Sequence, residues 1–320
     1  MNMTEQGILS QFPYWKKATF PSPLRDMDSL HVVIGCGTSY NLALTIAAAM
    51  TESGMLAMAV PAGEWYLRPH SYVSSDRISR TVVIALSRSG STTETVDAAR
   101  ASRDLGQTVI GLTCAPDTPL ARACTTIHAF ETFPDEGIVM TASASLMLLA
   151  GLALAGFDIG ADLADRAQAM LETFDKVSPA TYSDRTHFVF LGGGANYGLA
   201  LEGALKLQEM ALCFTQGFHP GEYRHGPVSL VDEKTAIVML YHPETRDLEE
   251  ALTRELSEKG ALIIGFDGPG DVSVTDDIAD PRQTAVILPS LQLLGERYAA
   301  VNGVDTTQPR HLTKVVVLDK

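Results

Sequence analysis

Six hydroxyl side chains surround one glycine between residues 87 and 95, and this is the clearest place for chemistry in the chain: Ser87, Ser89, Ser91, Thr92, Thr93 and Thr95. The apolar run 81–86 before them predicts a buried strand, and the segment 92–104 predicts a helix. At such a turn, free backbone N–H groups and the positive end of the helix dipole attract anions, and hydroxyls add donors. A helix cap is the simpler interpretation, but it needs only one hydroxyl. The pattern therefore favours a phosphate-binding turn.

A second motif holds two carboxylates and a lysine at helical spacing. Glu202, Lys206 and Glu209 lie four and three residues apart, which places them on one face of a helix. A surface ion pair of little energetic value is one interpretation. The other is a catalytic base, because this helix follows a glycine-rich strand end, where open α/β sheets place their ligands, and burial there raises the pKa of a carboxyl group.

A loop histidine and a lysine near the C-terminus complete the candidates. His225 lies among glycines and prolines at 218–227. Histidine is the residue type suited to proton transfer near neutral pH, so His225 is a candidate donor to a sugar ring oxygen, although a single loop histidine is more often solvated. Lys314 precedes the apolar run 315–318. If the tail folds over a pocket, desolvation allows this lysine to form a Schiff base with a carbonyl substrate. A solvated tail is the alternative.

The elements that position these groups alternate between strand and helix. Strands are predicted at 31–34, 81–86, 109–113 and 126–130, and again at 188–191, 236–241, 262–266 and 285–288. The two sets are offset by about 155 residues, which indicates a duplicated unit. Alternation predicts parallel sheets with helices on both faces. We expect an N-terminal helix and linker at 1–29, α/β domains at 30–160 and 175–301 joined by a helical stretch, 143–174, and a tail at 302–320.

Both halves begin with a strand and a glycine-rich turn, which raises the possibility of a dinucleotide cofactor. Tyr40 and Tyr197 occupy the position of the third glycine in that motif. The sequence therefore disfavours a nicotinamide or flavin cofactor, and no cofactor is predicted.

Composition narrows the partners and the compartment. The chain has 320 residues, 46% of them hydrophobic, and a formal net charge of −14, which disfavours nucleic acids and anionic membranes as partners. Four scattered cysteines without paired spacing disfavour a disulfide framework and a zinc site, and no metal is predicted. The longest apolar stretch, 146–157, is too short to cross a bilayer, and no targeting segment is apparent at the start. We expect a cytoplasmic protein that binds a small molecule.

Several of these motifs together resemble the sugar isomerase (SIS) family, and most closely the isomerase half of glucosamine-6-phosphate synthase: CGTSYN at 36–41, LSRSGST at 86–92, ALEGALKLQE at 200–209, GEYRHGP at 221–227 and QPRHLTK at 308–314. The resemblance covers nearly the whole chain from about residue 31. It implies two SIS domains of the flavodoxin-like, three-layer αβα class.

The resemblance also implies roles for individual residues. The phosphate and the sugar would be held by Ser39, Ser87, Ser89 and Thr92, with Arg88 replacing a glutamine common in the synthase and Thr141 replacing a serine that contacts the sugar. Glu209 would move a proton between C1 and C2 with the help of Lys206, and His225 would open the ring. Lys314 matches a tail lysine that forms a Schiff base with the ketose, so the tail would be a lid. Because that histidine comes from the neighbouring subunit in the synthase, a homodimer with shared active sites is implied.

The expected activity is that of an aminosugar-phosphate deaminase and isomerase, which converts glucosamine 6-phosphate to fructose 6-phosphate and ammonia. No glutaminase domain precedes residue 31, so no internal ammonia source is expected. Cleavage of a fructosamine 6-phosphate and simple aldose–ketose isomerisation remain open. A non-catalytic sugar-phosphate sensor is a further alternative, but no basic helix-turn-helix candidate lies before residue 31.

Overall fold

A computed structural model describes residues 1–318, which divide into two compact units. The N-terminal unit comprises Pro13–Ala161 and the tail from Thr313 onward, and the C-terminal unit comprises Met1–Phe12 and Asp162–Leu312. The N-terminal helix α1 (Met3–Leu9) thus belongs to the C-terminal unit, where Asn2 Nδ2 donates to Glu296 Oε1 at 2.5 Å. Each unit contains one five-stranded parallel sheet, so the predicted α/β fold with two similar parallel sheets is confirmed.

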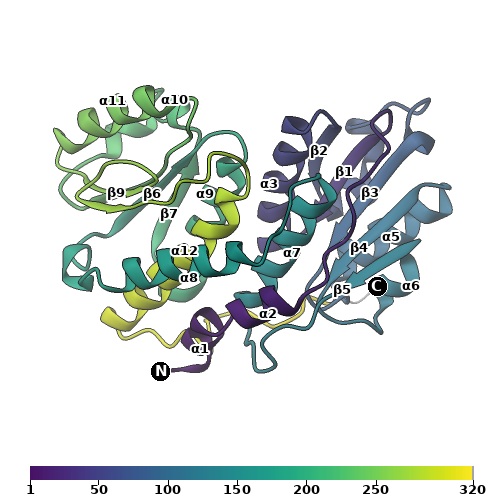
Figure 1. The fold of residues 1–320 in the computed structure, drawn as a ribbon, viewed down its shortest axis with the longest axis horizontal. Coiled ribbons are helices and arrows are strands. Elements are labelled where there is room, and N and C mark those ends of the chain that lie inside the picture. The colour runs from purple at the N-terminus through teal and green to yellow at the C-terminus, as the bar shows by residue number, and fades with distance from the viewer. Residues whose placement is uncertain (319–320) are drawn as a thin grey trace. The chain divides into compact units, whose positions relative to one another are not determined.

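The sheet of the N-terminal unit has the strand order β2-β1-β3-β4-β5. In Figure 1, helices α3 and α7 lie on one side of this sheet and α5 and α6 on the other. The elements are α2 (Phe12–Lys17), β1 (Leu30–Gly35), α3 (Thr38–Glu52), β2 (Leu56–Pro61), α4 (Ala62–Leu67), β3 (Thr81–Leu86), α5 (Thr93–Asp104), β4 (Thr108–Thr113), α6 (Pro119–Ala123), β5 (Thr126–Ala129) and α7 (Ala142–Leu154).

The sheet of the C-terminal unit has the order β10-β9-β8-β6-β7, the same pattern of connections. Helices α10 and α11 lie on one side of it and α8 and α12 on the other (Figure 1). The further elements are α8 (Asp162–Asp175), β6 (His187–Gly192), α9 (Asn196–Ala211), β7 (Phe214–Phe218), α10 (Pro220–Tyr223), β8 (Thr235–Leu240), α11 (Arg246–Ser257), β9 (Leu262–Phe266), β10 (Val272–Val274) and α12 (Gln283–Val301).

One predicted strand is wrong, and three real strands escaped prediction. Residues 285–288 belong to α12, whose residues 283–296 are all buried. A short apolar run inside a helix buried on every side cannot be told from a buried strand by periodicity. The missed strands are β2, β7 and β10, which all lie at or next to a sheet edge. Edge strands carry fewer buried apolar residues, and Phe214 in β7 is 88% exposed.

The apolar stretch 146–157 largely forms α7, and all thirteen residues of that helix are buried. The predicted helical stretch between the domains is in fact two helices, α7 and α8, separated by a break at 155–161 that contains Gly156 at a φ of +98°. Among the residues that the structure describes, no helix is long and apolar enough to cross a membrane.

Candidate functional site

The hydroxyl-rich turn of the N-terminal unit lies at the point where the order of the strands in its parallel sheet reverses. The chain passes from β1 to β2 on one side and reaches β3 on the other, so β1 and β3 flank the point at which open α/β sheets bind ligands. Ser39 follows β1 at the start of α3, and Ser87 follows β3. Since the two strands are parallel neighbours, both serines lie at the same edge of the sheet, at the N-terminal ends of two helices.

The turn itself is tightly organised. The Ser87 hydroxyl donates to Thr92 Oγ1 at 3.3 Å, and Thr92 is the N-cap of α5 without a side-chain capping bond. The Ser89 hydroxyl accepts from the Ser91 N–H at 3.2 Å. Gly90 has a φ of +60°, and a Cβ there would overlap the Thr118 hydroxyl, so only glycine fits. The hydroxyl of Thr92 is therefore not consumed by capping, as an anion-binding role requires.

Arg88 turns away from the hydroxyls and binds backbone carbonyl groups. Its side chain is 9% exposed. Nη1 donates to Gly137 O at 3.0 Å, and Nη2 donates to Ile138 O at 3.1 Å and to Lys314 O at 2.9 Å. One guanidinium thus joins the turn, the loop before α7 and the C-terminal tail.

Glu136 belongs to this site, although no motif in the sequence singled it out. Its Oε1 accepts the N–H of Thr141 at 2.8 Å, the hydroxyl of Thr141 at 3.0 Å and the N–H of Ser143 at 3.0 Å. Its Oε2 has no hydrogen bond but lies 3.7 Å from Arg88 Nη1. This buried carboxylate caps the start of α7 and fixes Thr141. An acidic residue shortly before a strongly apolar helix was the signal available in the sequence.

The tail brings Lys314 into the same network. Lys314 Nζ donates to the backbone carbonyl of Glu136 at 2.5 Å. Further along, the Thr93 N–H donates to Val316 O at 3.3 Å, and the Leu318 N–H donates to Thr93 Oγ1 at 3.0 Å. The structure thus brings Arg88, Thr141 and Lys314 together around Glu136, and it places the tail against the start of α5, directly after the hydroxyl-rich turn.

The carboxylate and lysine motif of the C-terminal unit lies on α9 and is buried. Lys206 Nζ lies 3.3 Å from Glu202 Oε1 and 2.7 Å from Glu209 Oε2. Lys206 and Glu202 are 0% exposed, whereas Glu209 is 21% exposed. Burial lowers the pKa of Lys206, but the two neighbouring carboxylates outweigh it, so this pKa lies above its usual value. The arrangement is a buried charge cluster with one accessible carboxylate, not a surface ion pair.

The place of this cluster on the sheet differs from the sequence-based expectation. Helix α9 starts at the carboxyl edge of the sheet, but Glu209 lies thirteen residues after Asn196, roughly 20 Å further along the helix axis. Gln208 Nε2 donates to the carbonyl of Thr215 at 3.3 Å, at the beginning of β7. Glu209 is therefore near the amino edge of its own sheet. The sequence predicts a place at the opposite, carboxyl edge, where open α/β sheets bind their ligands.

His225 lies on a separate, anchored loop of the same unit. Tyr223 is fully buried in the core, and Arg224 binds Glu255 with Nη2 to Oε1 at 2.9 Å. These two residues fix the loop. His225 follows them with its side chain exposed.

The turn of the C-terminal unit that corresponds to the hydroxyl-rich turn already contains an anion. There the N-cap of α11 is Thr245, which corresponds to Thr92, the N-cap of α5 in the other unit. The residue four positions after the cap is Glu249 in α11 and Val96 in α5. The Glu249 carboxylate accepts from the His242 N–H and the Thr245 hydroxyl, both at 2.8 Å. Burial raises its pKa. A phosphate would meet this carboxylate at the C-terminal unit's turn, which makes that turn unfavourable for an external anion.

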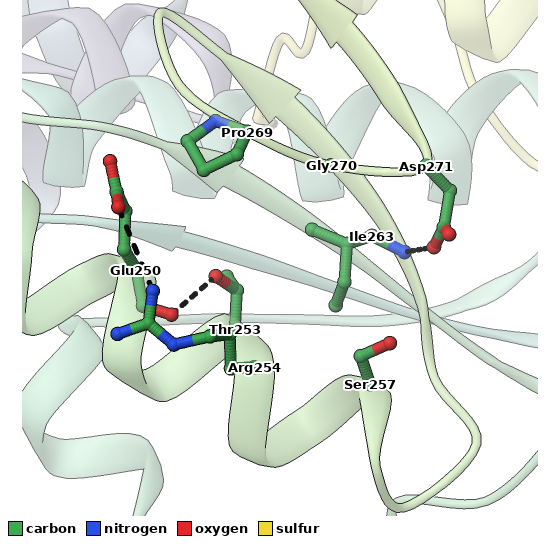
Figure 2. Close-up of a pocket in the computed structure, with 8 residues that line it drawn as sticks. All are labelled: Glu250, Thr253, Arg254, Ser257, Ile263, Pro269, Gly270 and Asp271. Atoms are coloured by element: carbon green, nitrogen blue, oxygen red, sulfur yellow. Dashed lines mark hydrogen bonds and ion pairs between the residues drawn. The ribbon is translucent and has the colours of Figure 1, made fainter.

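A cavity of about 290 Å³ in the C-terminal unit contains none of the predicted residues. Figure 2 shows it between α11 and the segment that joins β9 to β10. Arg254 in its wall pairs with Glu250 at 3.7 Å, and Asp271 accepts the Ile263 N–H at 2.8 Å. Two carboxylates against one guanidinium make this cavity unfavourable for a phosphate. Among residues 1–318, no group of three or more His, Cys, Asp or Glu side chains is placed to hold a metal ion.

Comparison with known proteins settles the family. The sequence model of the SIS domain matches residues 29–155 and 181–277. The chain belongs to the SIS-domain family. The predicted membership is thereby confirmed, and the two matched segments contain the hydroxyl-rich turn and the α9 cluster of this SIS protein, respectively.

Several proteins similar to this SIS protein are named for reactions of sugar 6-phosphates. It is 28% identical over 327 residues to a glutamine–fructose-6-phosphate aminotransferase (isomerizing) of Gloeobacter violaceus, which covers 92% of this chain and 52% of that protein. The chain spans about half the length of the curated relatives that it matches. A glucosamine-6-phosphate deaminase from Thermotoga maritima is 30% identical, with a TM-score of 0.86 over 99% of this chain and 100% of that one. A tagatose-6-phosphate ketose/aldose isomerase from Escherichia coli shares the fold, with a TM-score of 0.81 at 24% identity over 94% of this chain and 93% of that one.

Proposed function

We propose that this SIS protein converts an aminosugar 6-phosphate, foremost glucosamine 6-phosphate, into a ketose 6-phosphate and ammonia. The single observation that carries the proposal is the similarity to the Thermotoga maritima deaminase, which covers 99% of this chain and 100% of that one and so extends over both units. The hydroxyl-rich turn and the α9 cluster supply the two kinds of group that such a reaction needs, an anion cradle and a protected base.

In this proposal the phosphate is held by Ser39, Ser87, Ser89 and Thr92. The positive ends of the α3 and α5 helix dipoles and the hydroxyls of the turn share the negative charge. Thr141, held by Glu136 through both its N–H and its hydroxyl, contacts the sugar. This leaves C1 and C2 of the open-chain sugar for the acid–base groups.

The proton chemistry falls to His225 and Glu209. His225 protonates the ring oxygen and opens the sugar to the aldehyde. The Glu209 carboxylate removes the proton from C2 while O1 takes up a proton, which gives an enolamine. Glu209 then returns its proton to C1, which becomes a CH₂OH group, and the nitrogen loses one proton as C2 becomes an imine, which balances the proton gained at O1. Lys206 stays protonated between its two carboxylates and stabilises Glu209 as an anion before the proton transfer.

Hydrolysis of the imine completes the reaction. The Lys314 amine adds to C2 and displaces ammonia, and water then hydrolyses the lysine Schiff base to the ketone. The balance is one aminosugar phosphate and one water consumed for one ketose phosphate and one ammonia released. We propose a homodimer as the active form, with the exposed His225 acting in the active site of the neighbouring subunit.

The test is an assay of ammonia release and ketose phosphate formation by the purified protein on glucosamine, galactosamine and fructosamine 6-phosphates. Ammonia and fructose 6-phosphate in equal amounts from glucosamine 6-phosphate support the proposal. Glucose 6-phosphate and a free amine from a fructosamine 6-phosphate would replace it with the deglycase alternative. If no aminosugar phosphate yields ammonia, the proposal is wrong, and interconversion of aldose and ketose phosphates becomes the activity to measure.

A further inference from the structure

The guanidinium of Arg88 is the point at which three segments of the N-terminal unit meet. Its own backbone carbonyl is fixed by the Thr113 hydroxyl and the Cys114 N–H, both at 3.1 Å, so the residue is held at the end of β4. From this fixed position, the side chain reaches the carbonyls of Gly137, Ile138 and Lys314. A planar guanidinium has five N–H donors in a rigid fork, so one arginine side chain can donate hydrogen bonds to several acceptors at once.

These contacts leave Arg88 poorly suited to bind a phosphate directly. Both terminal nitrogens already donate to carbonyl oxygens within 3.1 Å, and the Glu136 carboxylate at 3.7 Å compensates the positive charge. Only 9% of the side chain is exposed. A phosphate that approached it would have to displace the three buried hydrogen bonds that this guanidinium donates.

Lys314 is held both by its backbone carbonyl and by its side-chain ammonium group. Its carbonyl accepts from Arg88, and its ammonium group donates to the carbonyl of Glu136. Glu136 in turn binds Thr141 and the start of α7 through the other end of its side chain. Arg88 and Glu136 therefore fix where the tail lysine stands relative to the hydroxyl-rich turn, although the two residues precede it by 226 and 178 positions.

We propose that Arg88 is a positioning residue that, together with Glu136, clamps the C-terminal tail so that the Lys314 amine is presented to the substrate held at the turn. This inference rests on the proposed function for the part that concerns catalysis, but the clamp itself is a property of the tail that can be measured without any substrate. Arg88 acts through Lys314 and does not touch the reacting atoms.

The first test measures the tail directly. Hydrogen–deuterium exchange of the peptide 313–318 is followed in the full-length protein for wild type, Arg88→Gln and the control Arg80→Gln, which removes an exposed arginine of the same unit. We expect the tail of Arg88→Gln to exchange roughly tenfold faster or more, since a buried charge-assisted hydrogen bond is lost. Arg80→Gln should exchange like wild type. Equal exchange in Arg88→Gln and wild type would overturn the clamp, whatever the enzyme's substrate is.

The second test separates positioning from phosphate binding. If Arg88 acts through Lys314, Arg88→Gln lowers kcat about tenfold or more with KM changed less than about twofold, and it has no further effect in a Lys314→Ala background. Arg88→Lys should not restore kcat, because a single ammonium cannot bridge the three carbonyls. A raised KM in both backgrounds, or full rescue by lysine, would show that Arg88 binds the phosphate as a charge and would overturn the proposal.

Folding of the variants is controlled by a charge-balanced pair. Arg88→Gln leaves the buried Glu136 carboxylate without its guanidinium, which can destabilise the unit. The double variant Arg88→Gln with Glu136→Gln removes both charges, so no unpaired buried charge remains. The clamp predicts fast tail exchange in this double variant as well, and a wild-type rate there would contradict it.

Discussion

Substitution of the buried Lys206 on α9 should destabilise the protein far more than substitution of Glu209 beside it. Lys206→Met keeps the length of the side chain and removes its charge. The cluster has two carboxylates and one ammonium, with Lys206 and Glu202 0% exposed. Without the ammonium, a fully buried carboxylate faces a second one and loses its cation.

The size of the effect follows from the geometry. At the 3.3 Å separation of Lys206 Nζ from Glu202 Oε1, Coulomb's law with an effective dielectric constant near 20 gives about 5 kcal/mol, from which the cost of desolvation is subtracted. Breaking a buried pair by removing one partner costs about 3–5 kcal/mol. We therefore expect Lys206→Met to lower the free energy of unfolding by about 3–5 kcal/mol. Glu209→Gln should cost about 1 kcal/mol or less, because its side chain is part-exposed and a charge-neutral buried pair remains.

Urea unfolding followed by far-UV circular dichroism at pH 7.5 measures these differences. The set comprises wild type, Lys206→Met, Glu209→Gln and the double variant Glu202→Gln with Lys206→Met. The double variant should recover at least about half of the loss, since the carboxylate left without its cation is gone. A loss below about 1 kcal/mol in Lys206→Met, or no recovery in the double variant, would refute the assignment of Lys206 as the charge that holds this cluster together.

Three other predictions concern the loop histidine, the thiols and pH. The Glu209→Gln and His225→Asn variants should each be inactive as homodimers, and subunit exchange between them should restore about a quarter of wild-type activity. Half of the dimers are then mixed, and each mixed dimer contains one complete site out of two. A mixture without activity would contradict the shared active site. Burial raises the pKa of Cys124 to about 12 and that of Cys213 to about 11, so at pH 8 only about one Cys213 side chain in a thousand is a thiolate. Cys213 should therefore be alkylated by iodoacetamide at least about a hundredfold more slowly in native than in urea-unfolded protein, as measured by mass spectrometry of its peptide; equal rates would disprove this. Burial raises the pKa of Glu249 above its ordinary 4.5, so the folded state binds this proton more tightly than the unfolded state, and the free energy of unfolding falls as pH rises from about 4.5 through the folded pKa. The urea midpoint of Glu249→Gln should therefore fall less steeply with pH than that of wild type. Parallel pH profiles of the two proteins would show that Glu249 does not contribute.

The sequence predicted the parts of the fold and the site that depend on local pattern. The strand before the hydroxyl-rich turn, the helix after it and the helical spacing of Glu202, Lys206 and Glu209 all lie within short segments, where periodicity and turn chemistry are informative. The predictions for edge strand β7 and helix α12 failed, because β7 is partly exposed and α12 is almost completely buried, so neither shows the alternation of apolar and polar residues typical of its type.

The contacts of Arg88 and Glu136 could not be predicted in the same way. Arg88 is the second residue after the buried strand β3 and reaches the tail 226 residues later. Glu136 looks like one more acidic residue in a loop until the fold brings the start of α7 and the tail to it. Tertiary packing decides these partners, and no spacing within the sequence encodes them. The same holds for the burial of Lys206, since a surface pair and a buried cluster have identical helical spacing.

The role of Glu209 as the base between C2 and C1 is the central claim, and one comparison tests it most directly. Wild type and Glu209→Gln are each incubated with glucosamine 6-phosphate in deuterated water, and ammonia release and deuterium at C1 of the product are measured alongside the binding of fructose 6-phosphate. We predict that wild type releases ammonia and forms fructose 6-phosphate in equal amount, and that Glu209→Gln binds the ketose phosphate with little change but releases no ammonia and incorporates no deuterium. Full activity of Glu209→Gln would contradict the account.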